Sequence, residues 1–304
     1  MSSVEPVILG RVDPAEPLDR EELPPASSFP GPGLRRLGGW LLNTWAVFGF
    51  LFLFAPIFVI VLFSFNRPEG NYNLLWHEFT LENWAHPFAV SELVDALEQS
   101  LKIAALATVV AVVMGALVAL ALTRYRFRGG ALVNLFLVLP LTTPEVVLGA
   151  ALASLFLDQD VDRGFTTVFI AHVMFCVSFV ALTVKARLRG FDWTLEDAAM
   201  DLGAGPMRVF RTVTFPLMVP GILAAALLSF ALSLDDFIIT QFNAGPGPKS
   251  VETFPIYVFG ASQRAFPPQI NVLTTVILMV SVILLFVGTV FQGFREGRRV
   301  RRTA

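Results

Sequence analysis

Charged residues are scarce in this sequence. Only 15% of its 304 residues are Asp, Glu, Lys or Arg, whereas 55% are hydrophobic. An ordinary soluble domain carries about 25% charged residues, and a disordered chain carries few apolar ones. The composition therefore excludes a water-soluble globule, a disordered chain and collagen. Apolar runs of this length predict several passes through a membrane.

Cysteine is almost absent, since Cys176 is the single one. An intrachain disulfide is excluded, and no group of Cys and His residues has the spacing of a zinc site. We therefore expect no metal site. His172, which lies inside an apolar run, is expected to be a hydrogen-bonded buried histidine rather than a proton relay.

The first residues lack the features of a secretory leader. Met1–Gly33 contains several prolines and acids but no apolar run, whereas a signal peptide has a positive start and an apolar core. We expect residues 1–39 to form a disordered cytoplasmic tail.

Six apolar runs are long enough to cross a bilayer core of about 30 Å. Helices satisfy their backbone hydrogen bonds inside lipid, and the spacing between charged segments suits helices far better than the alternating strands of a barrel, which have about 10 residues each. We expect an all-α polytopic membrane protein with a membrane domain over residues 40–294 and a basic tail over 295–304. The expected spans are Trp40–Phe65, Ser100–Leu122, Ala131–Leu157, Phe165–Val184, Val219–Phe242 and Ile270–Phe294.

Positive charges favour one side of the predicted membrane domain. Of the 22 Lys and Arg residues, 17 fall in the tails and in the loops on one side. Cytoplasmic loops carry the excess of Lys and Arg, so both termini are expected in the cytoplasm, with an even number of spans. The other five are Arg67, Lys102, Arg163, Lys249 and Arg264.

A loop on the positive side, residues 195–217, has the pattern of two short helices. Acids in the first turn suit a helix over Glu196–Leu202, and Gly203 followed by Gly205-Pro206 ends it. A second helix is expected from Met207 towards Phe215. Such a helix-turn-helix offers a docking element for another protein.

This loop resembles that of the permease subunits of ATP-binding cassette (ABC) importers. Their signature is Glu-Ala-Ala, three residues, Gly, nine residues, then Ile, any residue and Leu-Pro. The spacing is kept here, with Asp197 beside Glu196 in place of the Glu, and with Val213 and Phe215 in place of the Ile and Leu. The resemblance implies the type I importer permease fold and a coupling helix that docks on the ATPase. The residues implied in coupling are Glu196, Asp197, Ala198, Ala199, Gly203, Val213 and Pro216.

The motif that cradles ATP phosphates is missing. It requires Gly, four residues and then Gly-Lys-Ser/Thr, whereas the one Lys-Ser pair, Lys249-Ser250, follows Pro248. We expect no catalytic residue and no cofactor on this chain, and we expect ATP and Mg to bind a separate ATPase subunit.

Three carboxylates lie inside the expected spans, where ionisable groups are costly and indicate function. Glu145 falls about 21 Å along its span and Asp235 about 24 Å along a parallel one, so both reach a similar depth. Asp235 and Asp236 point about 100° apart, so one can line a path while the other caps a helix or pairs internally. Acids at one depth suit an elongated organic polycation; internal pairing or contact with outer water is the alternative. Pro144 beside Glu145 is a candidate gate or a packing kink.

The resemblance narrows to the spermidine/putrescine permeases through four stretches. These begin at Ser64, Leu139, Leu232 and Thr253 and include Pro144-Glu145 and Leu234-Asp235-Asp236-Phe237. It implies half of a pore for polyamines in a bacterial inner membrane. The implied partners are a second permease chain, two cytoplasmic ATPase subunits and an extracytoplasmic binding protein, with the lipid bilayer around them and no nucleic acid.

Other functions remain open at this point. The importer could carry ferric iron, an amino acid or another organic cation. A secondary carrier driven by protons at Glu145 or Asp235 would leave the loop unexplained. An intramembrane aspartyl hydrolase is disfavoured, because adjacent aspartates are poorly placed to share a proton across about 3 Å.

Overall fold

The structure is a computed structural model that describes residues 32–247 and 250–283. It divides into two compact units, Met1–Val59 and Ile60–Ala304. Helix α1, Pro32–Phe63, crosses this division and begins within the stretch expected to be the tail. Residues 1–31 of that tail and the basic tail 295–304 lie outside the described residues.

A small folded segment follows α1. Strand β1, Asn66–Arg67, pairs antiparallel with β2, Glu78–Phe79, and α2 covers Glu82–Ala85. Buried asparagines tie the segment together, because a side-chain amide both donates and accepts hydrogen bonds. Asn66 Nδ2 donates to Asn73 Oδ1 at 2.7 Å, and Asn83 Nδ2 donates to the Asn66 carbonyl at 2.9 Å.

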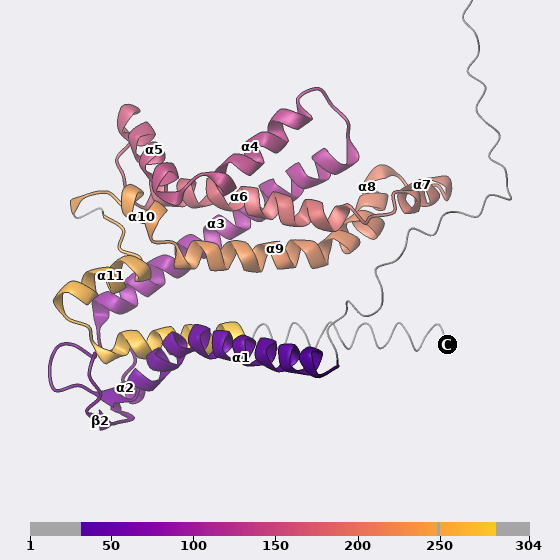
Figure 1. The fold of residues 1–304 in the computed structure, drawn as a ribbon. Helices are drawn as coiled ribbons and strands as arrows, with labels where there is room; N and C mark the ends of the chain where they lie inside the picture. Colours follow the sequence, from indigo (N-terminus) through magenta and orange to yellow (C-terminus); the bar gives the residue numbers. More distant parts are fainter. Residues whose placement is uncertain (1–31, 248–249, 284–304) are drawn as a thin grey trace, which may run out of the picture. The chain divides into compact units, whose positions relative to one another are not determined.

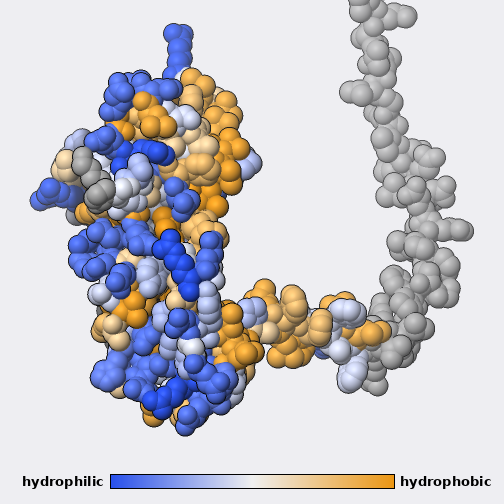
Figure 2. Space-filling view, turned by 90° about the vertical axis from the view of Figure 1, so that its left-hand side faces the viewer, coloured by the Kyte–Doolittle hydropathy of each residue, from blue (hydrophilic) through white to orange (hydrophobic). Residues whose placement is uncertain are grey.

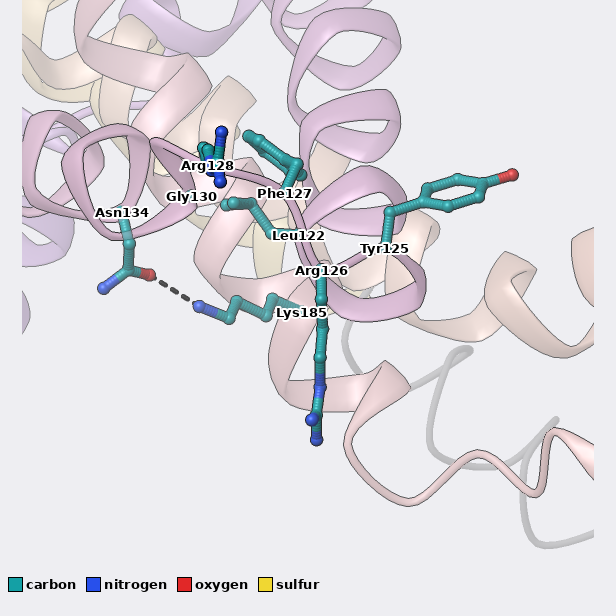
Figure 3. Close-up of a pocket in the computed structure, with 8 residues that line it drawn as sticks. All are labelled: Leu122, Tyr125, Arg126, Phe127, Arg128, Gly130, Asn134 and Lys185. Atoms are coloured by element: carbon teal, nitrogen blue, oxygen red, sulfur yellow. Dashed lines mark hydrogen bonds between the residues drawn. The ribbon is translucent and has the colours of Figure 1, made fainter.

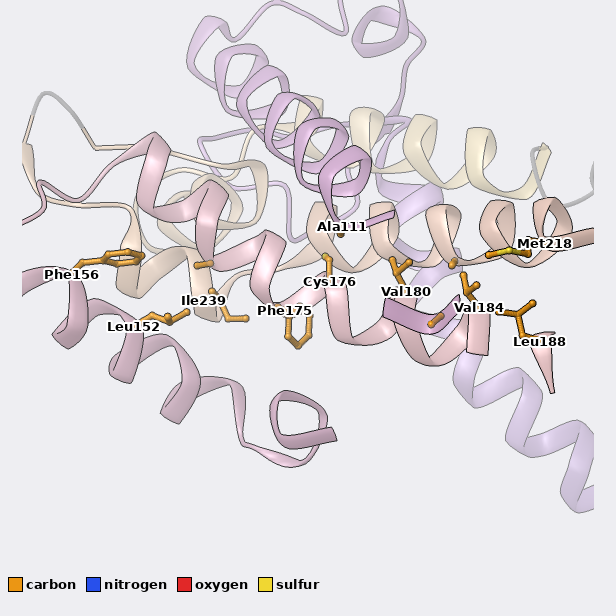
Figure 4. Packing of buried hydrophobic residues seen from close by; sticks show 13 residues of the cluster. Ala111, Leu152, Phe156, Phe175, Cys176, Val180, Val184, Leu188, Met218 and Ile239 are labelled. Carbon is orange, nitrogen blue, oxygen red and sulfur yellow. The ribbon is translucent and has the colours of Figure 1, made fainter. Parts of the chain in front are cut away.

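The core of the second unit is formed by three long helices that lie side by side (Figure 1). They are α3 (Ser91–Arg124), α6 (Phe165–Leu188) and α9 (Phe215–Asp235). Small residues permit close approach of helices in a membrane, and a Cβ on Gly115 would lie 2.7 Å from Val180 Cγ1. Figure 4 shows the buried cluster between these helices, which includes Phe175, Val184 and Met218.

The third expected span is divided in two. Helix α4, Gly130–Thr142, and helix α5, Glu145–Asp158, meet at a bend of 111°. Proline disfavours the helical region for the residue before it, and Thr143 before Pro144 is extended (φ −81°, ψ 132°). The expectation of one continuous helix over Ala131–Leu157 is therefore corrected. The break lies at Pro144, and whether this residue is a gate or a packing kink stays a prediction.

The fifth expected span is also interrupted. Helix α9 ends at Asp235, Asp236 is extended (φ −64°, ψ 124°), and the short α10 covers Ile238–Asn243. Helix α10 packs against α5, so the two interruptions belong to helices in contact. The continuous helix expected over Val219–Phe242 is corrected accordingly.

Most of the remaining helices lie at the two ends of the second unit. At one end lie α7 (Thr194–Asp201), α8 (Pro206–Val209) and the π-helical turn η2 (Phe210–Thr214). At the other end α11, Phe254–Arg264, packs on α3, and a further apolar helix begins at Pro268 and reaches Ile283. Figure 2 shows hydrophilic residues gathered over this second end and hydrophobic ones on the flanks.

Four of the described helices are long and apolar enough to cross a membrane, and five spans result if the bent pair α4–α5 counts as one. The four are Trp40–Phe63, Ser91–Arg124, Phe165–Leu188 and Pro206–Asp235. The sixth expected span, Ile270–Phe294, is described only as far as Ile283. The number six and the side of the termini remain predictions.

Candidate functional site

Helices α7 and α8 form the turn that the sequence predicts. Gly203 follows α7 with a φ of +83°, a region that side chains disfavour. The Gly203 N–H donates to the Met200 carbonyl at 2.8 Å, and the Ala204 N–H donates to the Ala199 carbonyl at 3.1 Å. This is the hydrogen-bond pattern of a Schellman cap. A Cβ on Gly203 would meet nothing within 4 Å, so the glycine serves the backbone conformation and not close packing.

The entry into α7 is held by Asp192. Its Oδ1 accepts the Thr194 N–H at 3.1 Å and the Thr194 hydroxyl at 2.7 Å. Hydrogen bonds to the charged form lower the pKa of the Asp192 carboxyl below its ordinary value. The exposed aspartate therefore stays ionised and marks the start of the helix.

An exposed surface runs along α7 and α8. Asp197 and Ala198 are exposed, Leu202 is 90% exposed and Met207 is 64% exposed. Large apolar side chains in water next to small ones are typical of a protein–protein contact. We call Asp197, Ala198, Leu202 and Met207 the α7–α8 surface.

Glu196 points away from this surface. It is 4% exposed and forms an ion pair with Arg124, the last residue of α3. The Thr214 hydroxyl, in η2, donates a hydrogen bond to Glu196 Oε1. A buried carboxylate requires such partners to offset its desolvation. Glu196 therefore ties α7 to the end of α3 and to the turn that leads into α9.

Aromatic rings surround the cation of this pair. The Arg124 guanidinium lies 5.3 Å from the centroid of the Trp193 ring and 5.9 Å from that of Tyr125. Phe191 and Trp193 contact each other with centroids 4.4 Å apart. Such faces attract a cation and exclude water, which strengthens the ion pair. We call Arg124, Glu196 and Thr214 the anchor.

Sequence reasoning missed Arg124, Trp193 and Thr214 as members of the site. From the sequence, Arg124 is counted only among the Lys and Arg residues on the positive side of the predicted membrane domain. One signal was available, because Glu196 and Asp197 are consecutive on a helix and point about 100° apart. They cannot both face a partner. The identity of the inward partners depends on tertiary structure.

The last two residues of the expected motif lie at the entry to α9. Val213 is half-buried in η2, and Pro216 is exposed in the first turn of α9, where a proline costs no intrahelical hydrogen bond. π-Helical turns are rare in proteins, and those that do occur are often found at functional sites. Here the turn contains Thr214, which contacts Glu196.

Asp236, one of the predicted pathway carboxylates, is buried at the break between α9 and α10. Its Oδ2 accepts the Thr240 N–H and the Thr240 hydroxyl, both at 2.8 Å, and lies 3.3 Å from His172 Nε2. The other nitrogen, His172 Nδ1, lies 2.7 Å from Ser233 Oγ. The expectation of a buried, hydrogen-bonded His172 is confirmed, and Asp236 serves as the cap and internal partner that one of the two aspartates was expected to be.

The other two carboxylates, Asp235 and Glu145, are exposed on the chain. Neither forms a salt bridge within residues 32–247 and 250–283. Asp235 ends α9 and Glu145 begins α5 after the exposed Pro144. One turn beyond Glu145, a Cβ on Gly149 would lie 3.0 Å from Phe242 of α10. The contact of α5 with α10 thus places both acids at neighbouring helix breaks.

Among the described residues, no group of three or more His, Cys, Asp or Glu side chains is arranged to hold a metal ion. The arrangement of the anchor and the α7–α8 surface offers recognition by charge and transmission of movement. The α7–α8 surface can bind a partner, and the anchor joins it to α3 and α9. The exposed Asp235 lies at the far end of α9, and the exposed Glu145 lies at the start of α5.

Comparison with known proteins agrees with this geometry. Residues 111–301 match the family model described as binding-protein-dependent transport system inner membrane component. The chain is 36% identical over 260 residues to the putrescine transport system permease protein PotI of Escherichia coli strain K12, covering 83% of this chain and 91% of that protein. It is 34% identical over 246 residues to the spermidine/putrescine transport system permease protein PotC of Haemophilus influenzae, covering 81% and 94%.

A solved structure supports the same fold. A chain of a bacterial ABC transporter that imports the acidic polysaccharide alginate superposes with a TM-score of 0.60 at 15% identity, covering 87% of this chain and 98% of that one. The family match, the two relatives and this fold all indicate the same family. The chain belongs to the family of binding-protein-dependent transport system inner membrane components.

Proposed function

We propose that this protein is one half of the translocation pore of an ATP-driven importer of polyamines. The observation that carries the proposal is its similarity, over more than four fifths of the chain, to permeases named for putrescine and spermidine. The exposed Asp235 and Glu145 support a cationic substrate independently, because neither has a salt-bridge partner among the described residues. An ammonium group of the substrate supplies the missing positive charge.

The partners follow from the family. A second permease chain completes the pore, two ATPase subunits bind in the cytoplasm and hydrolyse ATP with Mg, and an extracytoplasmic binding protein delivers the polyamine. This chain has no phosphate-binding loop of its own. It serves as the transport subunit and catalyses no reaction.

The anchor suggests how movement reaches the pore. When the ATPase dimer closes, it displaces the α7–α8 surface. Because Glu196 joins α7 to Arg124 of α3 and to Thr214 before α9, the displacement passes to both helices. Packed helices shift as units, and the movement of α9 carries Asp235 with it.

The proposal is tested by uptake into proteoliposomes that hold the full assembly, with its binding protein outside and ATP inside. We expect uptake of labelled putrescine or spermidine that requires hydrolysable ATP. Ferric iron and amino acids serve as alternative solutes. Uptake of one of these instead of a polyamine would contradict the substrate, and polyamine uptake driven by a proton gradient without ATP would contradict the importer.

A further inference from the structure

A basic pocket lies beside the anchor, at the end of the second unit that carries α7. It has a volume of about 460 Å³ and is formed by the end of α3, the link to α4, the start of α4 and the end of α6 (Figure 3). Because Arg124 of the anchor lies between the pocket residues Leu122 and Tyr125 in sequence, the pocket is at the end proposed to face the cytoplasm. Its lining residues are Leu122, Tyr125, Arg126, Phe127, Arg128 and Gly130, with Asn134 and Lys185 opposite.

The pocket carries three positive charges. Arg126 and Arg128 lie on the link from α3 to α4, and Lys185 on α6 reaches towards Asn134, with Nζ 2.5 Å from Oδ1 (Figure 3). Throughout the described part of the chain, no carboxylate lies within salt-bridge distance of these three cations. The charge of the pocket is therefore available to an anion.

An apolar groove of about 530 Å³ lies between the same three helices. On α3 its residues Val110, Met114 and Val118 recur every four positions, and Leu122 of the pocket continues the series. Residues four apart share a helix face. The apolar face of α3 therefore runs for about 18 Å from the groove to the pocket, a length similar to one leaflet of the bilayer core. The basic residues Arg126 and Arg128 follow just beyond the end of α3.

The other two helices also run from the groove to the pocket. On α4 the groove residues Val133 and Leu137 neighbour the pocket residues Gly130 and Asn134. On α6 Val173 and Val177 lie on the face that leads to Lys185. A ligand that fills both spaces must be apolar over most of its length and anionic at one end.

We propose that the groove and pocket bind an anionic phospholipid of the cytoplasmic leaflet. Its acyl chain lies along Val110, Met114 and Val118, and its phosphate lies in the combined positive field of Arg126, Arg128 and Lys185. Charge complementarity carries the choice of occupant, because basic pockets between transmembrane helices on the cytoplasmic side recognise anionic headgroups. The inference rests on the proposed cytoplasmic side of the end that carries α7, and not on the proposed substrate.

The test measures the lipid that remains bound to the full importer assembly. The assembly is reconstituted in vesicles of phosphatidylcholine with phosphatidylglycerol, extracted in mild detergent and analysed by mass spectrometry. We expect enrichment of phosphatidylglycerol. Each Lys or Arg near the surface contributes to lipid attraction by about fivefold, so Lys185→Gln is expected to reduce the enrichment about fivefold. Arg189→Gln, an exposed cation outside the pocket, is the matched control and leaves it unchanged.

Further experiments distinguish the contribution of the headgroup to binding from that of the acyl chain. Inorganic phosphate and a short-chain phosphatidylglycerol are expected to compete poorly, since neither fills the groove, and Val118→Trp is expected to lower retention of the long-chain lipid. Assembly of each variant is checked by its elution with the ATPase. Equal retention of the two lipids, displacement by phosphate alone, or a cross-link from a Val118→Cys variant to the second permease would overturn the proposal.

Discussion

Two pairs of consecutive acids each divide into one buried and one exposed carboxylate. Glu196 is buried against Arg124 and Thr214, whereas Asp197 is exposed. Asp236 is buried against His172 and Thr240, whereas Asp235 is exposed. Helix geometry predicts from the sequence that the members of a pair diverge. It does not predict which one turns inward, because the partners come from segments far along the chain.

The anchor makes a first prediction. Arg124→Gln leaves Glu196 buried without its counter-ion, and because Arg124 is about one third exposed we expect a loss of stability of about 1–3 kcal/mol. The double variant Arg124→Gln with Glu196→Gln removes both charges and is expected to be more stable than the single one. Thermal unfolding in detergent gives the stability, and the binding-protein-stimulated ATPase rate gives the coupling.

Arg189→Gln is the control for this pair, since Arg189 is exposed and has no ion pair in the described part of the chain. If the two charges act together, the double variant regains stability yet stimulates the ATPase weakly, because α7 is no longer tied to α3. If the losses of stability of the two single variants add up to the loss of the double variant, the two side chains act separately.

The aspartates make a second prediction. Asp236→Ala removes the acceptor of the Thr240 N–H and of the His172 ring, and each unsatisfied group costs about 1–3 kcal/mol. We therefore expect a lower unfolding temperature. Asp235→Ala is expected to keep stability and to raise the KM for polyamine about tenfold or more, since a charged hydrogen bond is lost. Unfolding and uptake are measured on both variants, and equal effects on stability would refute the division of roles.

At the scale of elements, the breaks in α4–α5 and α9–α10 mark the limit of sequence prediction. Pro144 is visible in the sequence, where it is a candidate gate or packing kink. Nothing comparable precedes Asp236, since neither proline nor glycine lies between Gly221 and Gly245. The α9 helix ends because the Asp236 side chain accepts the backbone N–H of Ile239 and Thr240, in competition with a continuous helix.

The α7–α8 turn was predictable in more detail. Glu196–Leu202 and Met207–Phe215 were expected as helices, and the structure has α7 over Thr194–Asp201 and α8 with η2 over Pro206–Thr214. Local signals, namely the first-turn acids and the glycines, determine both ends of α7. The π-helical form of η2 was not predictable.

A third prediction concerns this turn. Gly203→Ala puts a side chain at a φ of +83° and is expected to cost about 1–2 kcal/mol locally, which shifts the α7–α8 surface. Stimulated ATPase activity and uptake should fall while the protein remains in the membrane. Gly205→Ala is the matched control, because Gly205 has a φ of −69° and free space for a Cβ. Equal activity of the two variants would count against a coupling role for the turn.

At the scale of the whole molecule, the sequence predicted the family from one loop and a charge count. Four long apolar helices and one bent pair correspond to five of the six expected runs. The sixth is described only as far as Ile283, so the number six stays a prediction. The residues that form the buried core could not be predicted from the sequence in the same detail. All three core helices are apolar over most of their surface, so no polar face shows which residues, such as Gly115 or Val180, turn inward.

The central claim is that ATP hydrolysis is coupled through this chain to the passage of a polyamine. It is tested most directly by the ATPase rate of the reconstituted assembly with its binding protein, either empty or loaded with spermidine or putrescine. The account predicts a higher rate with a polyamine-loaded binding protein than with the empty one. Equal rates in the two cases, stimulation only by another solute, or failure of the chain to bind an ATPase subunit would contradict it.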